Sequence, residues 1–201
     1  MKSPLSKTHY FLICLWVSLM SSAFGQFDTK ATPIESISVK KGFEVELLFT
    51  VPKDKLGSWV NLCLDDKNRI IASDQFGGLY RFKAPAKGKT LKESDIEKVP
   101  AKIRAANGLL WAFDSLYVAV NDYEKKMESG VYRLTDSNGD DQLDKVEKLR
   151  GMEARGDHGV HALLLSPDKK SIYLITGNNT CLLYTSPSPR DRTRSRMPSS
   201  A

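Results

Sequence analysis

The sequence predicts an all-β fold built from repeated four-stranded units, and two observations support this. Apolar and polar residues alternate over short stretches of residues 42–180, as in Gly42–Thr50, which is the pattern of half-buried strands. The same order of strand, turn and loop then recurs along the chain. A long repeat of four short strands is typical of a propeller blade, so the predicted fold class is a β-propeller.

Each copy of the repeat begins with two apolar strands joined by a polar turn. A loop with Asp or Asn follows, then a strand that reads Gly, apolar, aromatic, Arg, and then an outer strand, expected at Ile96–Val99 and Lys145–Leu149. Alignment of Ile70, Tyr117 and Tyr173 gives spacings of 47 and 56 residues. A β-sandwich also alternates strands with turns and remains the alternative fold.

A six-bladed ring needs roughly 280 residues at 45 to 50 residues per blade. Residues 42–180 supply about three blades, so we expect a partial β-propeller from a longer parent protein. The early strand Gly42–Thr50 precedes the first full blade and is expected to have an unpaired edge. The chain alone is therefore expected to be poorly stable and inactive.

The N-terminus is expected to be a signal peptide over residues 1–25. Lys2 and Lys7 precede the apolar run Phe11–Met20, and small residues follow it up to Gly25. This three-part layout predicts export to the periplasm or the extracellular space. The apolar run is shorter than the ~20 residues that cross a bilayer, so no stable membrane span is expected after cleavage. An uncleaved anchor is the alternative, and residues 26–41 are expected to be a linker.

The C-terminal segment 181–201 differs in composition from the rest of the chain. It is rich in Ser, Pro and Arg, is expected to be disordered, and resembles translated adapter sequence at the ends of some metagenomic gene predictions. We interpret it as an artefactual tail; an Arg/Ser-rich nucleic-acid tail is the alternative. Without this tail and the signal region the charge of +6 falls to +1, so no nucleic-acid partner is predicted. One cysteine, Cys63, is left and is expected to be a small core residue.

An Asp-rich stretch predicts a calcium loop between two strands. Oxygen-bearing residues follow the spacing of an EF-hand loop, with a backbone carbonyl at position 7 and a carboxylate at position 12. Position 6 is Asp141 where glycine is usual, which predicts weak affinity of roughly 0.1 to 1 mM. A solvated hairpin is the alternative. The expected ligands are Asp136, Asn138, Asp140, Gln142, Asp144 and Glu147.

A glycine-rich loop with two histidines precedes the third copy of the repeat. Arg155–His161 contains His158 and His161, and the glycines and the following strand argue against a helical metal site. A histidine in such a loop is a candidate general base.

The chain resembles the soluble quinoprotein glucose/sorbosone dehydrogenase-like six-bladed propellers, and more closely the large dehydrogenase-like propeller proteins of Planctomycetes and Verrucomicrobia. The resemblance covers nearly all of residues 42–180. It rests on five stretches: Gly42–Leu48, Gly78–Arg81, Asn107–Leu109, Gly130–Leu134 with the Asp-rich loop, and His158–His161 through to Asn178.

This resemblance implies specific roles for two residues. His158 would be the general base that takes a sugar hydroxyl proton beside pyrroloquinoline quinone. Asn178 stands where that family has an aspartate that orients the histidine, and an amide cannot stabilise an imidazolium by charge. The quinone-binding residues are unknown, because the resemblance places them in blades outside this chain. A cytochrome is the implied electron acceptor.

Three functions remain open for the parent protein. The first is an oxidoreductase that oxidises sugar or polyol hydroxyls. The second is a non-catalytic, calcium-stabilised propeller that binds carbohydrate or protein. The third is a calcium-dependent hydrolase of the lactonase kind.

Overall fold

The computed structural model describes residues 31–154, 156 and 158–181, and their secondary structure is almost entirely β. Short helical turns occur at η1 (Ile34–Ser36), α2 (Lys53–Leu56) and η2 (Glu93–Asp95). The strands are β1 (Trp59–Leu64), β2 (Arg69–Asp74), β3 (Leu79–Lys83), β4 (Glu97–Lys98), β5 (Ala106–Ala112), β6 (Ser115–Val120), β7 (Gly130–Thr135), β8 (Lys145–Gly151), β9 (Glu153–Ala154), β10 (Val160–Leu165), β11 (Ile172–Thr176) and β12 (Thr180–Cys181).

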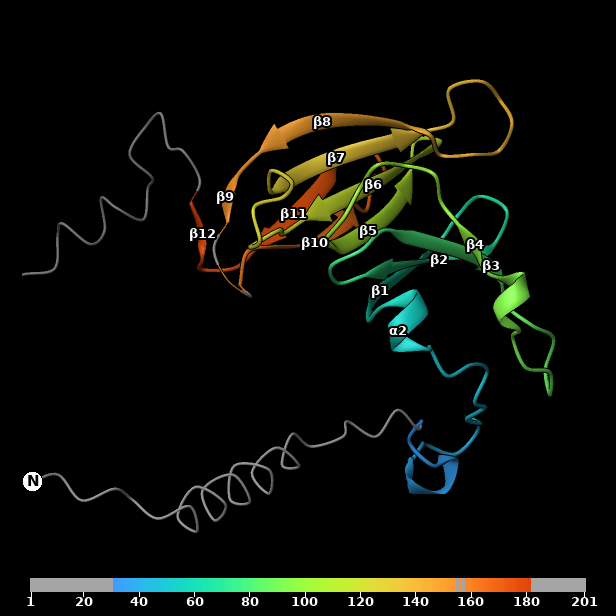
Figure 1. The fold of residues 1–201 in the computed structure, drawn as a ribbon. Helices are drawn as coiled ribbons and strands as arrows, with labels where there is room; N and C mark the ends of the chain where they lie inside the picture. The colour runs from blue at the N-terminus through green and yellow to red at the C-terminus, as the bar shows by residue number, and fades with distance from the viewer. Residues whose placement is uncertain (1–30, 155, 157, 182–201) are drawn as a thin grey trace, which may run out of the picture.

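The strands form two antiparallel sheets of four strands and two antiparallel pairs. The sheets have the orders β1-β2-β3-β4 and β5-β6-β7-β8, and the pairs are β10-β11 and β9-β12. Figure 1 shows the two sheets beside one another, and β10 also packs against β5 and β6. None of these sheets closes on itself. The all-β prediction and the four-stranded unit are confirmed, and closure into a propeller stays a prediction.

The strand register gives the repeat a firmer alignment than the sequence did. β1, β5 and β10 each carry a bulge near their start, at Val60, Asn107 and His161. Arg81 lies opposite Ile71, and its counterpart Arg133 lies opposite Tyr117. Ile71 therefore corresponds to Tyr117, and the alignment of Ile70 with Tyr117 is wrong by one residue. The reason is that the turn between the first two strands differs in length between the two copies. The match of Tyr117 with Tyr173 agrees with the register.

An arginine–glutamate pair recurs at the same place in both four-stranded sheets. Arg81 on β3 faces Glu97 on β4, with Nη2 3.0 Å from Oε1. Arg133 on β7 faces Glu147 on β8, with Nη2 2.5 Å from Oε2. The Gly-aromatic-Arg strand is thus tied to the expected outer strand in each sheet, and both outer strands are present.

Apolar residues of the inner strands pack each sheet against the next one. Leu109 of β5 belongs to the core cluster that contains Ile71 of β2, so this side of β5 faces the first sheet. Leu110 packs in the cluster of Val160 and Leu163, so the other side faces β10 and β11. β5 and β6 therefore lie between two neighbours, which is why the core is deepest there.

The early strand expected at Gly42–Thr50 is not formed. Phe43 is 72% exposed, and the described residues provide no strand that pairs with this segment. It runs instead beside the β3–β4 loop (84–96), where the Leu91 N–H donates to the carbonyl of Leu48 at 2.8 Å. An alternating pattern alone does not make a strand, because its backbone groups need a partner strand. Phe49 from this segment packs near Trp59, which stacks on Tyr80 and Phe82.

Within the described residues, no helix is long and apolar enough to cross a membrane. The predicted signal peptide (1–25) and the C-terminal tail from residue 182 lie outside the described residues.

Cys63 packs against the core between the first two sheets, as expected for a small core residue, although it is only half-buried. Burial, together with the nearby Asp65 carboxylate, raises the pKa of its thiol to about 12. The folded state therefore holds the thiol protonated. Unfolding becomes more favourable as the pH rises above about 8.5, which is the pKa of the thiol in the unfolded chain.

We expect Cys63 to react slowly with iodoacetamide in the folded chain, because the thiolate is the reactive form. At pH 8 the rate should be at least ~100-fold lower than in urea, given this shift in pKa. Peptide-level mass spectrometry separates Cys63 from the other cysteines. Equal rates in the folded and unfolded chain would contradict this burial.

Candidate functional site

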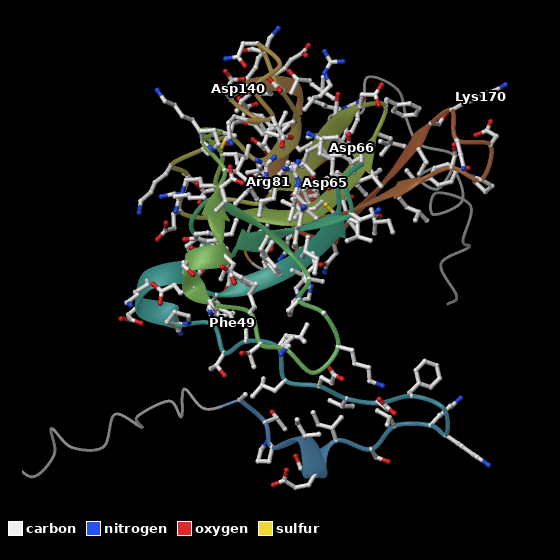
Figure 2. All side chains as sticks on the ribbon, turned by 90° about the vertical axis from the view of Figure 1, so that its right-hand side faces the viewer. Phe49, Asp65, Asp66, Arg81, Asp140 and Lys170 are labelled. Atoms are coloured by element: carbon white, nitrogen blue, oxygen red, sulfur yellow. The ribbon has the colours of Figure 1, made fainter. Side chains whose placement is uncertain are left out.

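The two candidate sites lie at opposite ends of the sheets. The loop that links β7 and β8 (136–144) lies at the same end as the β1–β2 turn, because Arg69 and Asp141 form an ion pair across the two sheets. The segment before β10 lies at the other end, where Asn121 follows β6 and donates from Nδ2 to the Gly156 carbonyl at 3.1 Å. Figure 2 shows the end that carries the β7–β8 loop in the upper part of the view. The turns at this end carry Asp65, Asp66, Asp140 and Lys170.

His158 lies two residues before β10, and close contacts with glycines hold its backbone. A Cβ on Gly177 would lie 2.3 Å from the His158 carbonyl oxygen, and a Cβ on Gly108 would lie 2.2 Å from that of His161. A Cβ on Gly159 would lie 1.9 Å from Oδ1 of Asn121. The first two distances are to backbone atoms and admit only glycine, so the fold fixes the backbone at His158 and at His161.

The His158 side chain is exposed, and its ring lies beside that of His161. The two rings lie edge to face with their centroids 6.4 Å apart. His161 occupies the bulge of β10, and Asn107 occupies the matching bulge of β5. A bulge leaves one residue of the strand without a pairing partner. In both strands this residue is polar and lies near the start of the strand.

Asn178 lies close to His158 along the backbone but not in a hydrogen bond with it. The Asn179 N–H donates to the His158 carbonyl at 3.0 Å, and the Gly177 N–H donates to Gly159 at 2.7 Å. Within the described chain, no hydrogen bond joins the side chains of His158 and Asn178. The structure thus brings the two predicted residues to one hairpin end, and Asp157 lies outside the described residues.

Sequence reasoning missed a buried ion pair at the same end. Asp122 is 3% exposed, and its Oδ2 accepts from Arg104 Nη1 at 2.5 Å and from the Met127 N–H at 2.9 Å. Arg104 also contacts Glu124 and the Phe76 carbonyl, so it joins the first two sheets. The Asn-Asp dipeptide after β6 was the available signal, but the partner of Asp122, Arg104, lies 18 residues earlier in the chain.

A buried amide oxygen lies beside the segment that carries His158. The Asn121 side chain is buried, and among residues 31–154, 156 and 158–181 its Oδ1 has no hydrogen-bond partner. Burial of an unpaired amide oxygen is costly, so this atom is a natural acceptor for a donor entering the loop.

The Asp-rich loop is folded by its own oxygen-bearing side chains. Asp136 Oδ1 accepts from the Gly139 N–H at 2.7 Å and Oδ2 from the Asp141 N–H at 2.7 Å. Asn138 and Asp140 accept from N–H groups two residues ahead. Desolvation raises the pKa of Asp136, but these N–H donors outweigh it and hold the pKa below its usual value.

The later predicted ligands have other partners. Asp144 accepts from the Ser137 hydroxyl at 2.7 Å and from its N–H, which lower the pKa of Asp144. Gln142 donates from Nε2 to Glu97 at 2.5 Å, and Glu147 pairs with Arg133. Within the described residues, no group of three or more acidic, His or Cys side chains converges as a metal cluster. Calcium binding stays a prediction.

Asp141 takes the left-handed backbone that the missing glycine requires, with φ at 70°. Its carboxylate receives both terminal nitrogens of Arg69, at 2.5 and 2.8 Å, and Lys67 at 2.9 Å. Arg69, followed by Lys67, holds the pKa of Asp141 well below its ordinary range. The residue at loop position 6 therefore ties the Asp-rich loop to the first sheet.

Comparison with protein-family models finds no match for this chain, and comparison with curated proteins finds none either. The family resemblance therefore remains an expectation based on the motifs.

We expect Gly177→Ala to displace the His158 backbone, because the added Cβ has no room. The loss of stability should be about 1–3 kcal/mol, as for other overpacking changes, and the His158 ring signals should shift in ¹H–¹³C NMR spectra. Gly78→Ala is the matched control, since a Cβ there would lie 3.7 Å from its nearest neighbour. Unchanged His158 signals in Gly177→Ala would contradict the fixed backbone.

We expect the chain to bind calcium with a Kd of roughly 0.1 to 1 mM. Asp136→Asn and Asp144→Asn should each weaken binding, whereas Asp114→Asn in the β5–β6 turn should not. Because the pKa values of Asp136 and Asp144 are lowered, affinity should hold from pH 7 to pH 5 and fall only below about pH 4. Isothermal titration measures this, and no binding at millimolar calcium would favour the solvated hairpin.

Proposed function

We propose that the chain is part of an exported six-bladed propeller of the quinoprotein dehydrogenase type, which oxidises sugar or polyol hydroxyls. The observation that carries the proposal is the position of His158, an exposed imidazole on a backbone fixed by glycines at one end of the sheets. A base on a fixed backbone reaches only a limited part of this end of the sheets, which favours one place for a substrate.

The ring part of the proposal is supported by the repeat. Two sheets of four strands share the same register, the same bulge in the inner strand and the same Arg–Glu pair. The third copy provides β10 and β11, whose bulge matches at His161. Successive copies pack sheet against sheet, β1 and β2 on β5 and β10 on β5 and β6, and a propeller repeats such sheets radially around a central channel.

In the proposed reaction His158 accepts the hydroxyl proton, while a hydride leaves the carbon for an electron acceptor. The acceptor implied by the resemblance is pyrroloquinoline quinone. The resemblance places the residues that hold this quinone in blades outside this chain, and Arg104 at this end is already held by Asp122 and Glu124. We therefore derive no step through the quinone.

A non-catalytic, calcium-stabilised binding propeller is the second candidate. It is favoured by Asn178, which lacks the charge that would support a protonated His158. The Asp-rich loop lies at the opposite end, so calcium there would support the fold rather than contact a substrate. This arrangement suits a binding module as well as an enzyme.

Dye reduction with a panel of sugars, using the full-length protein that carries this chain with added quinone and calcium, tests the first candidate. His158→Gln should lower kcat by at least about 100-fold, the usual contribution of a general base. Lys170→Gln, at the other end of the sheets, is the control. Sugar binding without dye reduction in the wild type would favour the binding module.

The proposal also predicts a gain of function. Asn178→Asp restores a negative charge beside the His158 loop and should raise kcat by about tenfold, or ~1.4 kcal/mol. A rate that falls or stays constant would mean that residue 178 does not support the base.

A further inference from the structure

The contacts of the second copy of the repeat show which residues correspond to those around His158. The Asn121 N–H donates to the Ala105 carbonyl at 2.9 Å. In the third copy, the Gly177 N–H donates to the Gly159 carbonyl at 2.7 Å. Each bond joins the residue after the second strand to the residue two places before the bulge. The repeat therefore continues beyond the paired strands, into the segments that carry the candidate site.

His158 and Asn178 occupy the positions that form an ion pair in the second copy. Arg104 lies three residues before its bulge, as His158 does. Asp122 lies two residues after its second strand, as Asn178 does. Arg104 and Asp122 engage one another. In the described part of the third copy, no hydrogen bond joins the two corresponding side chains, so both are available to a ligand.

The bulge position carries a polar side chain in both copies, Asn107 in β5 and His161 in β10. The backbones of the two bulges touch, because a Cβ on Gly108 would lie 2.2 Å from the His161 carbonyl oxygen. Asn107 donates from Nδ2 to the carbonyls of Ala105 and Asn121 at 3.3 and 3.4 Å. These bonds anchor the amide nitrogen and leave the amide oxygen of Asn107 as an acceptor beside β10.

The bulge position is not one that a neighbouring copy of the repeat covers. β5 has apolar neighbours on both sides, from the first sheet and from β10 and β11. Asn107 nevertheless stays partly exposed, so its position lies apart from the contacts between sheets. His161 is partly exposed at the same position of β10. Its exposure therefore does not depend on the absence of a following sheet.

His161 lies close enough to His158 for both rings to contact one small ligand. The ring centroids are 6.4 Å apart, edge to face. Within residues 31–154, 156 and 158–181, neither ring takes part in a hydrogen bond or an ion pair. A neutral imidazole donates through one ring nitrogen and accepts through the other, and an amide oxygen accepts. A hydroxyl group both donates and accepts, so hydroxyls match these side chains.

We propose that His161 and Asn107 bind the hydroxyl next to the one that His158 deprotonates. They are specificity-determining residues, because they select substrates with hydroxyls on adjacent carbons over simple alcohols. A site that hydrogen-bonds a substrate hydroxyl rejects the analogue that lacks it, since the polar groups of the site then lose their partner. Sugars and polyols carry such hydroxyls, and this inference rests on the proposed dehydrogenase function.

Steady-state dye reduction by the full-length protein that carries this chain tests this selection. The substrates are the sugar of the panel that is oxidised fastest and its deoxy analogue, which lacks the hydroxyl next to the oxidised carbon. His161→Ala should lower kcat/KM for the sugar about tenfold, mainly through KM, as expected for one lost hydrogen bond. It should leave kcat/KM for the deoxy analogue unchanged. His161→Gln keeps a donor and an acceptor and should restore most of the loss.

Lys170→Gln, at the other end of the sheets, is the control and should change neither substrate's kinetics. Equal losses for the sugar and its deoxy analogue in His161→Ala would overturn the proposal, because His161 would then act through the fold. An unchanged KM for the sugar in this variant would overturn it as well, while the dehydrogenase function would stand.

Sugar binding separates this proposal from the dehydrogenase function. Each sugar of the panel is added to the full-length protein labelled with ¹³C-histidine, with and without quinone, and NMR follows the ring signals. If no dye is reduced but a sugar shifts the His161 signals, and His161→Ala weakens that binding, the dehydrogenase function fails and the binding role of His161 stands. No shift of the His161 signals with any sugar would overturn the proposal.

Discussion

The packing of inner strands, sheet against sheet, is the interaction on which the rest of the structure depends. β5 and β6 are covered on both sides, and Leu116, Val118 and Ala119 of β6 are fully buried. Gly108 lets β10 approach so closely that a single methyl group would not fit. The same packing that stabilises the centre therefore also sets the position of the segment that carries His158.

The two ends of the packed sheets carry different contacts and different candidate sites. At one end, Asp141 and Arg69 join a loop of one sheet to a turn of its neighbour. At the other end, Arg104 and the buried Asp122 join the same two sheets, and glycine contacts hold the segment that carries His158. Charge pairs at both ends supplement the apolar contact between the sheets. The calcium candidate is thus placed to stabilise the fold, and the histidine candidate is placed to meet a ligand.

Much of the fold could be predicted from the sequence because strand alternation and turn residues are local signals. The outer strands and the repeated Gly-aromatic-Arg strand were correct. Gly42–Thr50 was wrong, because pairing depends on a partner that a local pattern does not reveal. Arg104 with Asp122 and Arg69 with Asp141 were missed for the same reason: each pair joins residues distant in the chain. The roles of His158 and Asn178 came from resemblance, and the structure adds only their proximity.

Residue-resolved hydrogen exchange in a Leu109→Ala variant tests the dependence on sheet-to-sheet packing most directly. Leu109 is a β5 residue buried against the first sheet. If this packing governs the structure, the truncation should speed exchange in β1 and β2 as well as in β5 and β6. Faster exchange confined to the β5–β8 sheet would contradict it, because each sheet would then be stable by itself.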